Sequence, residues 1–483
     1  MPGWPGWLGM IVGLIDLAIK IVAVVTIPHN RRPSSSLAWL LLIILTPLFG
    51  LFLFFLIGSP FVRGRREAVQ ERADAAITSR AETLPDVPAG LELPDGMASV
   101  VRLNRDLTAM PMLGGSSHGL YGDYTASLAA MTTAVRASTS HVHLEMYAMA
   151  LDDATRDFFD AMADAVRRGV VVRVLYDHIG SRKYPGYRAM NAFMTKAGIE
   201  WHQMMPIKPL QRRWRRPDLR NHRKLLMVDS KVAFMGSQNL IASSYLMPAN
   251  IRAGRHWLDL MIELSGSIIS SMEAVFALDW LTETGESLAD RVPQPVSEEG
   301  EQPMQLIPSG PGYRTMPNLR LFTALIHRAQ YRLVITSPYF VPEDSLLEAI
   351  TTAAYRGVDV ELFVSEGADQ FIVQHAQASY YQGLLEAGVR IFQYPKPTVL
   401  HSKFFTVDDV AGVIGSSNMD YRSFGLTYEV SLLGTAPEFV ADLLRVAEEY
   451  REVSRELTAK EWSSRAAGWR YVENVTRLMA SLQ

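Results

Sequence analysis

Residues 221–239 read NHRKLLMVDSKVAFMGSQN, and residues 400–418 read LHSKFFTVDDVAGVIGSSN. Each stretch contains the pattern His-x-Lys-x-x-x-x-Asp, and the second pattern begins 401 − 222 = 179 residues after the first. A motif that recurs with the same surroundings indicates an internal duplication. The motif residues are His222, Lys224 and Asp229 in the first copy, and His401, Lys403 and Asp408 in the second.

The duplication extends beyond the motifs. Residues 163–175 (ADAVRRGVVVRVL) resemble residues 351–363 (TTAAYRGVDVELF), and in both copies apolar runs alternate with helical patterns. This order predicts an α/β fold: two α/β sandwich repeats with a mostly parallel or mixed sheet, related by a pseudo-twofold axis. The Pro- and Glu-rich segment 291–303 is the expected linker between a first repeat over 95–290 and a second over 304–483. The two motifs would then face each other across the seam, where ligand sites often lie.

The residue types in the motif favour phosphoryl chemistry. Residues i and i+2 of a strand point to the same face, so each histidine is predicted to lie beside its lysine. Lysine is not a usual metal ligand, whereas two ammonium groups suit the non-bridging oxygens of a phosphodiester. Two histidines on opposite sides of phosphorus suit a double displacement, in which one attacks and the other transfers protons.

Several other polar residues are candidates for the site. The two motif aspartates are grouped with the catalytic residues, although a turn-forming or salt-bridging role is also compatible with Asp229 and Asp408. Asp259 and Glu429 follow the two copies and are candidates to orient a histidine, with ordinary surface carboxylates as the alternative. The sequence leaves open which carboxylate serves which histidine. The predicted substrate-binding residues are Ser237, Asn239, Ser416 and Asn418.

Composition excludes several classes of protein. The chain has 483 residues, of which 48% are hydrophobic and 20% charged, and its mean hydropathy is +0.06. This composition excludes a disordered protein, and the net charge of −3 gives no global basic field for nucleic acid. The absence of cysteine excludes disulfides, thiol nucleophiles and cysteine-ligated metals. With no metal motif and no nucleotide-binding loop, we expect no metal and no cofactor.

The N-terminus carries two apolar segments, which predict a transmembrane hairpin over residues 1–63. Residues 37–57 contain 21 residues without a charge, enough to cross a bilayer as a helix. Residues 8–27 are also apolar apart from Asp16 and Lys20, which are spaced to neutralise each other. Arginines after the second segment weakly place the C-terminal part in the cytoplasm. A polar stretch, residues 64–94, is predicted to form an exposed helix and a Pro-rich linker.

A basic cluster precedes the first motif within residues 211–224, QRRWRRPDLRNHRK. Arginine beside tryptophan suits an anionic lipid headgroup, with a solvated face or nucleic acid as the alternatives. The C-terminal tail, with Trp and Leu among Arg residues, is predicted either to lie in a membrane interface or to dock on the domain. The cluster assigned to headgroups comprises Arg212, Arg213, Trp214, Arg215 and Arg216.

These motifs are the signature of the phospholipase D superfamily, and the chain from about residue 7 to its end resembles bacterial cardiolipin synthases. The resemblance is carried by RRPSSSLAWLL (31–41), IPSGPG (307–312), SPYFVP (337–342) and GSSNMDYRSF (415–424), as well as the motifs. One departure is Thr427, where the family usually has Asn two residues before the final Glu. This puts in doubt any contact with the acceptor that is assigned to that Asn.

The resemblance implies a multi-pass enzyme of the bacterial plasma membrane that condenses two phosphatidylglycerol molecules into cardiolipin and glycerol. It assigns His222 as the nucleophile and His401 as the acid/base, and implies anionic membrane lipids rather than nucleic acid as partners. The alternative is a phospholipase D-type hydrolase or another headgroup-exchange enzyme. A non-catalytic scaffold would be expected to have lost a His or Lys from one motif, and neither motif has.

Overall fold

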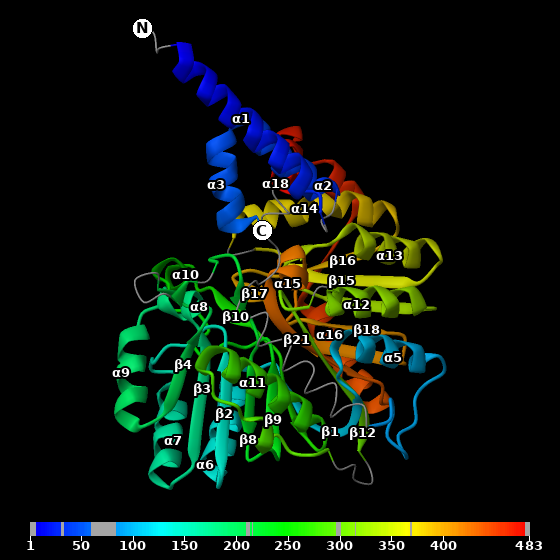
Figure 1. Ribbon diagram of the computed structural model, residues 1–483. Helices are drawn as coiled ribbons and strands as arrows, with labels where there is room; N and C mark the ends of the chain where they lie inside the picture. The colour runs from blue at the N-terminus through cyan, green and yellow to red at the C-terminus, as the bar shows by residue number, and fades with distance from the viewer. Residues whose placement is uncertain are drawn as a thin grey trace. The chain divides into compact units, whose positions relative to one another are not determined.

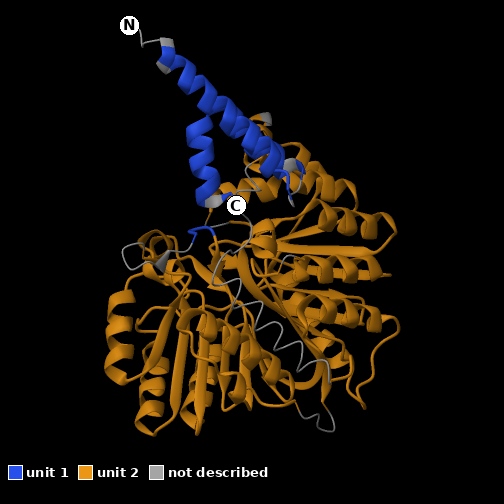
Figure 2. Cartoon of the chain, viewed as in Figure 1, with its two compact units in different colours: residues 1–62, 216–218 blue, residues 63–215, 219–483 orange. Residues whose placement is uncertain are grey.

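The computed structural model describes residues 6–29, 33–58, 84–208, 213–214, 216–295, 301–313, 315–367 and 370–478. These residues form two compact units (Figure 2). The first unit covers residues 1–62 together with 216–218, and the second contains the rest. The helix expected after residue 64 lies outside the described residues.

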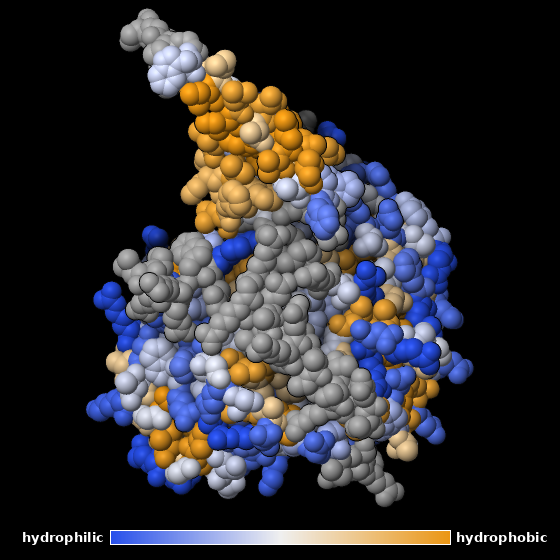
Figure 3. Space-filling model, in the orientation of Figure 1, coloured by the Kyte–Doolittle hydropathy of each residue, from blue (hydrophilic) through white to orange (hydrophobic). Residues whose placement is uncertain are grey.

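The first unit contains one helix that is long and apolar enough to cross a membrane. This helix, α1 (Gly6–Thr26), has an 18-residue apolar window, Gly9–Thr26, of which only 6% is buried. Apolar side chains therefore dominate its surface (Figure 3). The predicted neutralisation within α1 is confirmed, because Lys20 Nζ lies 2.8 Å from the Asp16 carboxylate.

The second apolar segment differs from the prediction of one continuous span. It is divided into α2 (Pro33–Leu45) and α3 (Pro47–Ile57), each shorter than a bilayer-crossing helix. Proline lacks an N–H group and disfavours helical geometry in the residue before it, and Thr46 has a non-helical ψ of 73°. The two helices pack closely at Gly50, where a Cβ atom would lie 2.8 Å from the Ile43 Cα atom.

The second unit is built around a sixteen-stranded mixed sheet (Figure 1). The first repeat contributes, in spatial order, β1 (Met112–Tyr121), β11 (Met261–Ser265), β9 (Val232–Gly236), β8 (Leu225–Val228), β2 (His141–Met146), β3 (Val171–Asp177) and β4 (Glu200–Met204). The second contributes, in the matching order, β12 (Gln302–Ser309), β21 (Thr427–Gly434), β19 (Ala411–Gly415), β18 (Phe404–Val407), β13 (Arg332–Thr336), β15 (Asp359–Ser365) and β16 (Arg390–Tyr394), followed by β22 (Arg455–Leu457).

The two halves meet where β1 and β12 pair antiparallel, and the strand order is the same going outward from this junction. Strands β2, β3 and β4 are parallel, as are β13, β15 and β16, whereas the strands nearer the junction are antiparallel. The structure therefore confirms the mixed α/β architecture in two related parts.

Helices flank this sheet and bury apolar faces against it. In α7 (Arg156–Arg167), for example, Phe158, Phe159 and Met162 are fully buried in the core of the first repeat. The other longer helices are α5 (Met97–Thr108), α6 (Tyr124–Ala137), α9 (Tyr187–Ala197), α11 (Ile268–Thr284), α12 (Pro317–Arg328), α13 (Asp344–Tyr355), α14 (Phe371–Glu386), α16 (Pro437–Val453) and α18 (Ala467–Leu478). Short elements are α8 (His178–Arg182), α10 (Pro248–Arg252), α15 (Tyr421–Gly425), α17 (Ala459–Ser463), β5 (Ile207–Lys208), β6 (Arg213–Trp214), β14 (Phe340–Val341), β20 (Met419–Asp420) and the 3₁₀ turn Ala289–Arg291.

The short strand that precedes each motif, β7 (Arg220–Asn221) in the first repeat and β17 (Thr398–Leu400) in the second, pairs with a strand of the other repeat. Strand β7 pairs with β21, and β10 (His256–Leu258) pairs with β17. The chain then continues directly into each motif. As a result, the backbone N–H of His222 donates to Tyr428 O at 2.8 Å, and that of His401 donates to Leu258 O at 2.7 Å.

Candidate active site

The two histidines and their lysines lie in short connections between strands, and not within a strand as predicted. His222 and Lys224 lie between β7 and β8, and His401 and Lys403 lie between β17 and β18. Each lysine folds back, so that its Nζ donates to the carbonyl oxygen of its own histidine. The pairing of His with Lys is therefore made through the backbone carbonyl.

Each histidine is held by the carboxylate of the other repeat. His222 Nδ1 lies 3.1 Å from both carboxylate oxygens of Glu429, and also 3.1 Å from Ser416 O. His401 Nδ1 lies 2.6 Å from Asp259 Oδ1. The crossed pairing follows from the short strands that precede the motifs. The His222 N–H donates to Tyr428 O, and Glu429 is the next residue. The His401 N–H donates to Leu258 O, and Asp259 is the next residue.

Hydroxyl groups hold the carboxylates in turn. Ser237 Oγ donates to Asp259 at 2.7 Å, and Ser416 Oγ donates to Glu429 at 2.5 Å. Each of the two serines that we predicted to bind substrate therefore donates a hydrogen bond to one of the buried carboxylates. The unusual Thr427 does the same, since its Oγ1 donates to Glu429 Oε1 at 2.9 Å.

The electrostatic environment keeps the carboxylates ionised. Both are buried, which by itself raises a carboxyl pKa, but the facing histidine, nearby lysine and hydrogen bonds outweigh burial. The pKa of Asp259 falls to about 2, and the pKa of Glu429 is also lowered. An ionised carboxylate accepts a hydrogen bond from Nδ1–H and so leaves Nε2 as the free ring nitrogen.

Burial also lowers the pKa of both histidines, that of His401 to about 4, so the rings are neutral at pH 7. The charges of Lys224 and Lys403 also lower both histidine pKa values. Burial lowers the pKa of Lys224 to about 7, and the charge of Lys403 adds to this effect. Two neutral imidazoles beside two buried lysines form a site prepared for an anion.

The motif aspartates make different contacts. Asp229, at a φ of +54°, accepts hydrogen bonds from the backbone N–H groups of Thr139, Ser140 and His141. Asp408, at a φ of +50°, accepts bonds from the N–H groups of residues 330–332. Each carboxylate thus ties the turn after a motif strand to the beginning of the neighbouring strand.

The two predicted asparagines are not equivalent. Asn239 Oδ1 accepts from Ala148 N–H at 3.1 Å, and its amide donates to the Tyr245 hydroxyl at 2.6 Å. Asn418 Oδ1 is buried and has no hydrogen-bond partner among the described residues. Asn239 therefore has a structural set of contacts, whereas Asn418 retains an unused acceptor.

Sequence reasoning missed two tyrosines beside the histidines. The rings of Tyr147 and His222 are 4.8 Å apart and nearly perpendicular, and those of Tyr339 and His401 are 6.3 Å apart in the same arrangement. Lys224 Nζ also lies 5.3 Å from the centre of the Tyr147 ring. The signal was present in the sequence, since each tyrosine follows an apolar strand of its repeat, in HVHLEMY and VITSPY.

Arg223 lies between the motif residues but is fully buried. Its Nε donates to Glu429 O at 3.1 Å, and its Nη1 pairs with Asp279 on α11. Burial and the nearby Asp279 charge raise the pKa of Glu145 well above its usual range, and Asn221 Nδ2 donates to this carboxyl at 2.8 Å. Arg223 therefore supports the backbone of the residue that holds His222.

The predicted headgroup cluster is only partly visible. Arg212 and Arg215 lie outside the described residues, and Arg213 and Trp214 form strand β6 with β5. Arg216 forms an ion pair with Asp218. The neighbouring Arg220 and Arg223, which belong to the same basic stretch, are buried in ion pairs and do not form a surface for headgroups.

One group of side chains could hold a metal ion. His141 Nε2, His143 Nδ1 and a Glu273 carboxylate oxygen lie within 4.8 Å of one another. Hydrogen-bonding distances of 3.2 Å and 2.7 Å join the two rings to Glu273. This group lies at the N-terminal end of β2, whereas Tyr147, which contacts His222, follows the C-terminal end, so the group is separate from the histidine pair.

Two α/β repeats that bring a histidine and a lysine each to one site define an enzyme of the phospholipase D superfamily. A family profile described as "Cardiolipin synthase, PLD-like domain" matches residues 131–280 and 322–451, and one described as "Phospholipase_D-nuclease N-terminal" matches residues 17–59. The chain belongs to the cardiolipin synthase family with this PLD-like domain.

Similar proteins agree with this family. The chain is 32% identical to "Cardiolipin synthase A" of Erwinia tasmaniensis over 95% of both chains. It is 29% identical to "Cardiolipin synthase" of Halalkalibacterium halodurans, over 99% of this chain and 95% of that protein. Among solved structures, phosphatidylserine synthase of Haemophilus influenzae has the same fold, with a TM-score of 0.59 and 14% identity over 79% of this chain and 99% of the other.

Proposed function

We propose that the protein is a membrane phosphatidyltransferase that condenses two phosphatidylglycerol molecules into cardiolipin and glycerol. The observation that carries the proposal is the crossed pair of His–carboxylate contacts, in which a neutral imidazole from each repeat is fixed through Nδ1 beside a buried lysine. The match to curated cardiolipin synthases along nearly the whole chain supports this acceptor.

In the first step, His222 Nε2 attacks the phosphorus of one phosphatidylglycerol. A P–N bond forms, the P–O bond to glycerol breaks, and His401 donates a proton to the departing glycerol oxygen. In the second step, His401 removes a proton from the terminal hydroxyl of a second phosphatidylglycerol. The resulting oxygen attacks phosphorus, the P–N bond breaks, and cardiolipin leaves with His222 neutral again.

Substrate charge completes the electrostatics of this mechanism. In the free site burial disfavours both the Lys224 ammonium and the His401 imidazolium, and the charge of Lys403 adds to this effect, so the pKa of Lys224 is about 7 and that of His401 about 4. A phosphodiester anion bound beside them would favour their protonated forms. We infer that the lipid binds with proton uptake and thereby loads His401 as the general acid. The unused acceptor of Asn418 is available for the glycerol hydroxyls.

The motif aspartates and serines then act through other groups. We assign Asp229 and Asp408 to turn stabilisation, because their carboxylates are occupied by backbone N–H groups. Ser237 and Ser416 act as positioning residues for the two carboxylates that face the histidines.

For the membrane part, we propose that α1 is one span and that α2 and α3 together form a kinked second span, which would give a multi-pass hairpin in the bacterial plasma membrane. The second unit would then lie on the cytoplasmic side, with the repeats bounded at about residues 95–290 and 304–483. The apolar surface of α1 and its internally neutralised charges support this arrangement.

The test is purified protein with phosphatidylglycerol in detergent micelles, compared with His222→Ala and His401→Ala. Cardiolipin with an equal amount of glycerol, lost in both variants and retained in excess EDTA, is the expected result. Phosphatidic acid without cardiolipin would show that water is the acceptor and establish the hydrolase alternative. A product formed only when another hydroxyl compound is added would establish headgroup exchange.

A further inference from the structure

Helices α14 and α18 pack together (Figure 1). Several of their apolar side chains are exposed. The two helices are joined by Trp469, which stacks on His375 at 5.1 Å, and by Arg477, which lies 4.5 Å above the Tyr380 ring. The exposed apolar residues that make no contact between the two helices, called here the α14–α18 face, are Phe371, Ile372, Tyr471, Val475 and Leu478.

The apolar stripe on α18 is distinct from the surface that packs on the domain. Tyr471, Val475 and Leu478 follow the i, i+4, i+7 spacing of one helix face, and Tyr471 and Leu478 are 72% and 82% exposed. Glu473 and Thr476, on the opposite side, are buried. The helix therefore has one face docked on the domain and a second apolar face that points outward.

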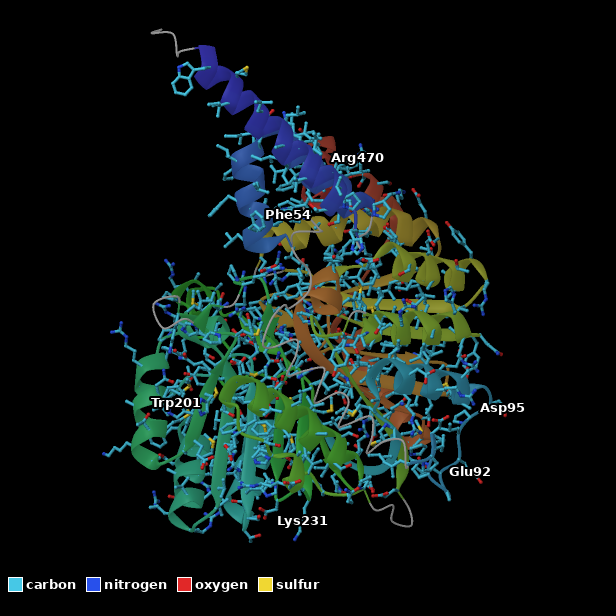
Figure 4. The ribbon with its side chains drawn as sticks, viewed as in Figure 1. Phe54, Glu92, Asp95, Trp201, Lys231 and Arg470 are labelled. Carbon is cyan, nitrogen blue, oxygen red and sulfur yellow. The ribbon has the colours of Figure 1, made fainter. Side chains whose placement is uncertain are left out.

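The charges on α18 have one sign at the surface. Its charged residues, all described, are Arg470, Glu473 and Arg477, and only the two arginines are exposed. Glu473 is buried and forms an ion pair with Arg465. Arg470 is labelled on α18 in Figure 4. The outward surface is consequently apolar, aromatic and cationic, the combination that binds the interface of an anionic bilayer.

We propose that the α14–α18 face inserts into the interface of an anionic lipid bilayer. Tyrosine favours the headgroup level, leucine and phenylalanine the acyl boundary, and arginine the phosphates. A second copy of the chain fits this surface less well. A twofold contact would place Arg470 and Arg477 against the same arginines of the partner, with like charges opposed.

This surface begins beside the active site. Gln370, which directly precedes Phe371, donates from Nε2 to the Tyr339 hydroxyl at 3.4 Å, and the Tyr339 ring faces His401. A lipid that keeps its acyl chains in the bilayer could thus present its phosphodiester near His401. This last step rests on the proposed function, whereas insertion of the face into a bilayer does not.

The test uses the absence of cysteine, which allows one fluorescent label per chain. The full-length variants Tyr471→Cys and Leu478→Cys, labelled with nitrobenzoxadiazole, are reconstituted into nanodiscs of phosphatidylcholine and phosphatidylserine. The matched control is Tyr355→Cys on α13, a tyrosine 73% exposed outside this face. We expect blue-shifted emission and quenching by doxyl-labelled lipid at 471 and 478 but not at 355. Emission at 471 and 478 that matches the control would overturn the proposal. A blue shift that persists in lipid-free micelles and grows with protein concentration would also overturn it, because it would indicate that a second copy of the chain covers the face.

An activity measurement separates this proposal from the proposed function. We expect Tyr471→Ser with Leu478→Ser to lower transfer in phosphatidylglycerol vesicles about tenfold, because two interfacial apolar groups are lost. In detergent micelles the same variant should keep its activity within about twofold, as should the control Tyr355→Ser in both systems. If the double variant keeps its activity in vesicles, the α14–α18 face does not contribute to transfer at a bilayer. If the wild-type protein makes no cardiolipin in micelles, the proposed function is refuted, but the insertion of the face is not.

Discussion

The crossed carboxylates predict that Glu429 and Asp259 affect different steps of the reaction. Glu429→Gln removes the negative charge that faces His222 and replaces one of the two acceptor oxygens beside Nδ1 with an NH2 donor. A hydrogen bond to a charged group contributes about 1.5–3 kcal/mol, and about 1.4 kcal/mol corresponds to tenfold in rate, so we expect kcat to fall about 10- to 150-fold. The same reasoning gives a similar loss for Asp259→Asn, through His401.

The assay that separates them uses a phosphatidyl donor with p-nitrophenol as the leaving group, measured in a single turnover without acceptor. Nitrophenolate departs without a proton, so the general acid is not needed in this half-reaction. If Asp259 serves His401 as the acid, the defect of Asp259→Asn should shrink to less than about threefold with this donor. The defect of Glu429→Gln should persist, because the nucleophile His222 is still required.

The control is Glu449→Gln on the exposed side of α16, which should leave both rates unchanged. Thermal unfolding of each variant shows whether the protein remains folded. A defect that disappears for Glu429→Gln and persists for Asp259→Asn would refute the assignment of the two histidines. Wild-type rates in either carboxylate variant with phosphatidylglycerol would refute the orienting role altogether.

Three further outcomes are expected. In the free enzyme Lys224, with a pKa of about 7, loses its charge as pH rises, so kcat/KM should fall more steeply above about pH 7 than below it. Lys224→Arg should have a lower kcat/KM without this break in the profile; an unchanged break in that variant would contradict this. Asp408→Asn should lower the free energy of unfolding by about 1–3 kcal/mol, because the carboxylate accepts hydrogen bonds from the N–H groups of Tyr331 and Arg332. Activity per folded molecule should stay within about threefold of wild type; lost activity at unchanged stability would indicate a catalytic role. Arg223→Leu should lower the free energy of unfolding by about 3–5 kcal/mol because the buried Asp279 loses its ion pair with Arg223. Arg223→Leu with Asp279→Leu should recover most of this loss; two additive losses would contradict the pairing.

The repeats and the motif histidines could be predicted from sequence because they depend on local patterns. Apolar runs of strand length, helical periodicity and the 179-residue offset determine the mixed sheet and the equivalence of the two halves. The composition of α1 likewise indicated a membrane helix, with its one ion pair between Asp16 and Lys20. The uncharged stretch 37–57 contains Pro47, but that the proline divides the segment into two helices became clear only from the backbone around Thr46.

The contacts that organise the site could not be predicted in this way, because they join distant parts of the chain. His401 and Asp259 are separated by 142 residues, and His222 and Glu429 by 207. Nothing in either motif distinguishes a carboxylate of the same repeat from one of the other repeat. Arg223 shows the same limit, since beside five other arginines it resembles a surface charge, whereas the fold buries it against Asp279.

The crossed contacts explain why two copies of the motif remain in one chain. Each repeat supplies a histidine and a lysine but relies on the other for the carboxylate that fixes its imidazole, so neither repeat contains a complete half-site. The two halves have nevertheless diverged where their proposed roles differ. The residue between histidine and lysine is Arg223 in the first copy, where it donates to the Glu429 carbonyl oxygen, and Ser402 in the second. The acid that faces His222 is a glutamate, Glu429, whereas the acid that faces His401 is the shorter Asp259. A symmetric site would give both histidines the same task. These differences give the proposed nucleophile and the proposed acid/base distinct surroundings, while both repeats keep the same His-x-Lys framework.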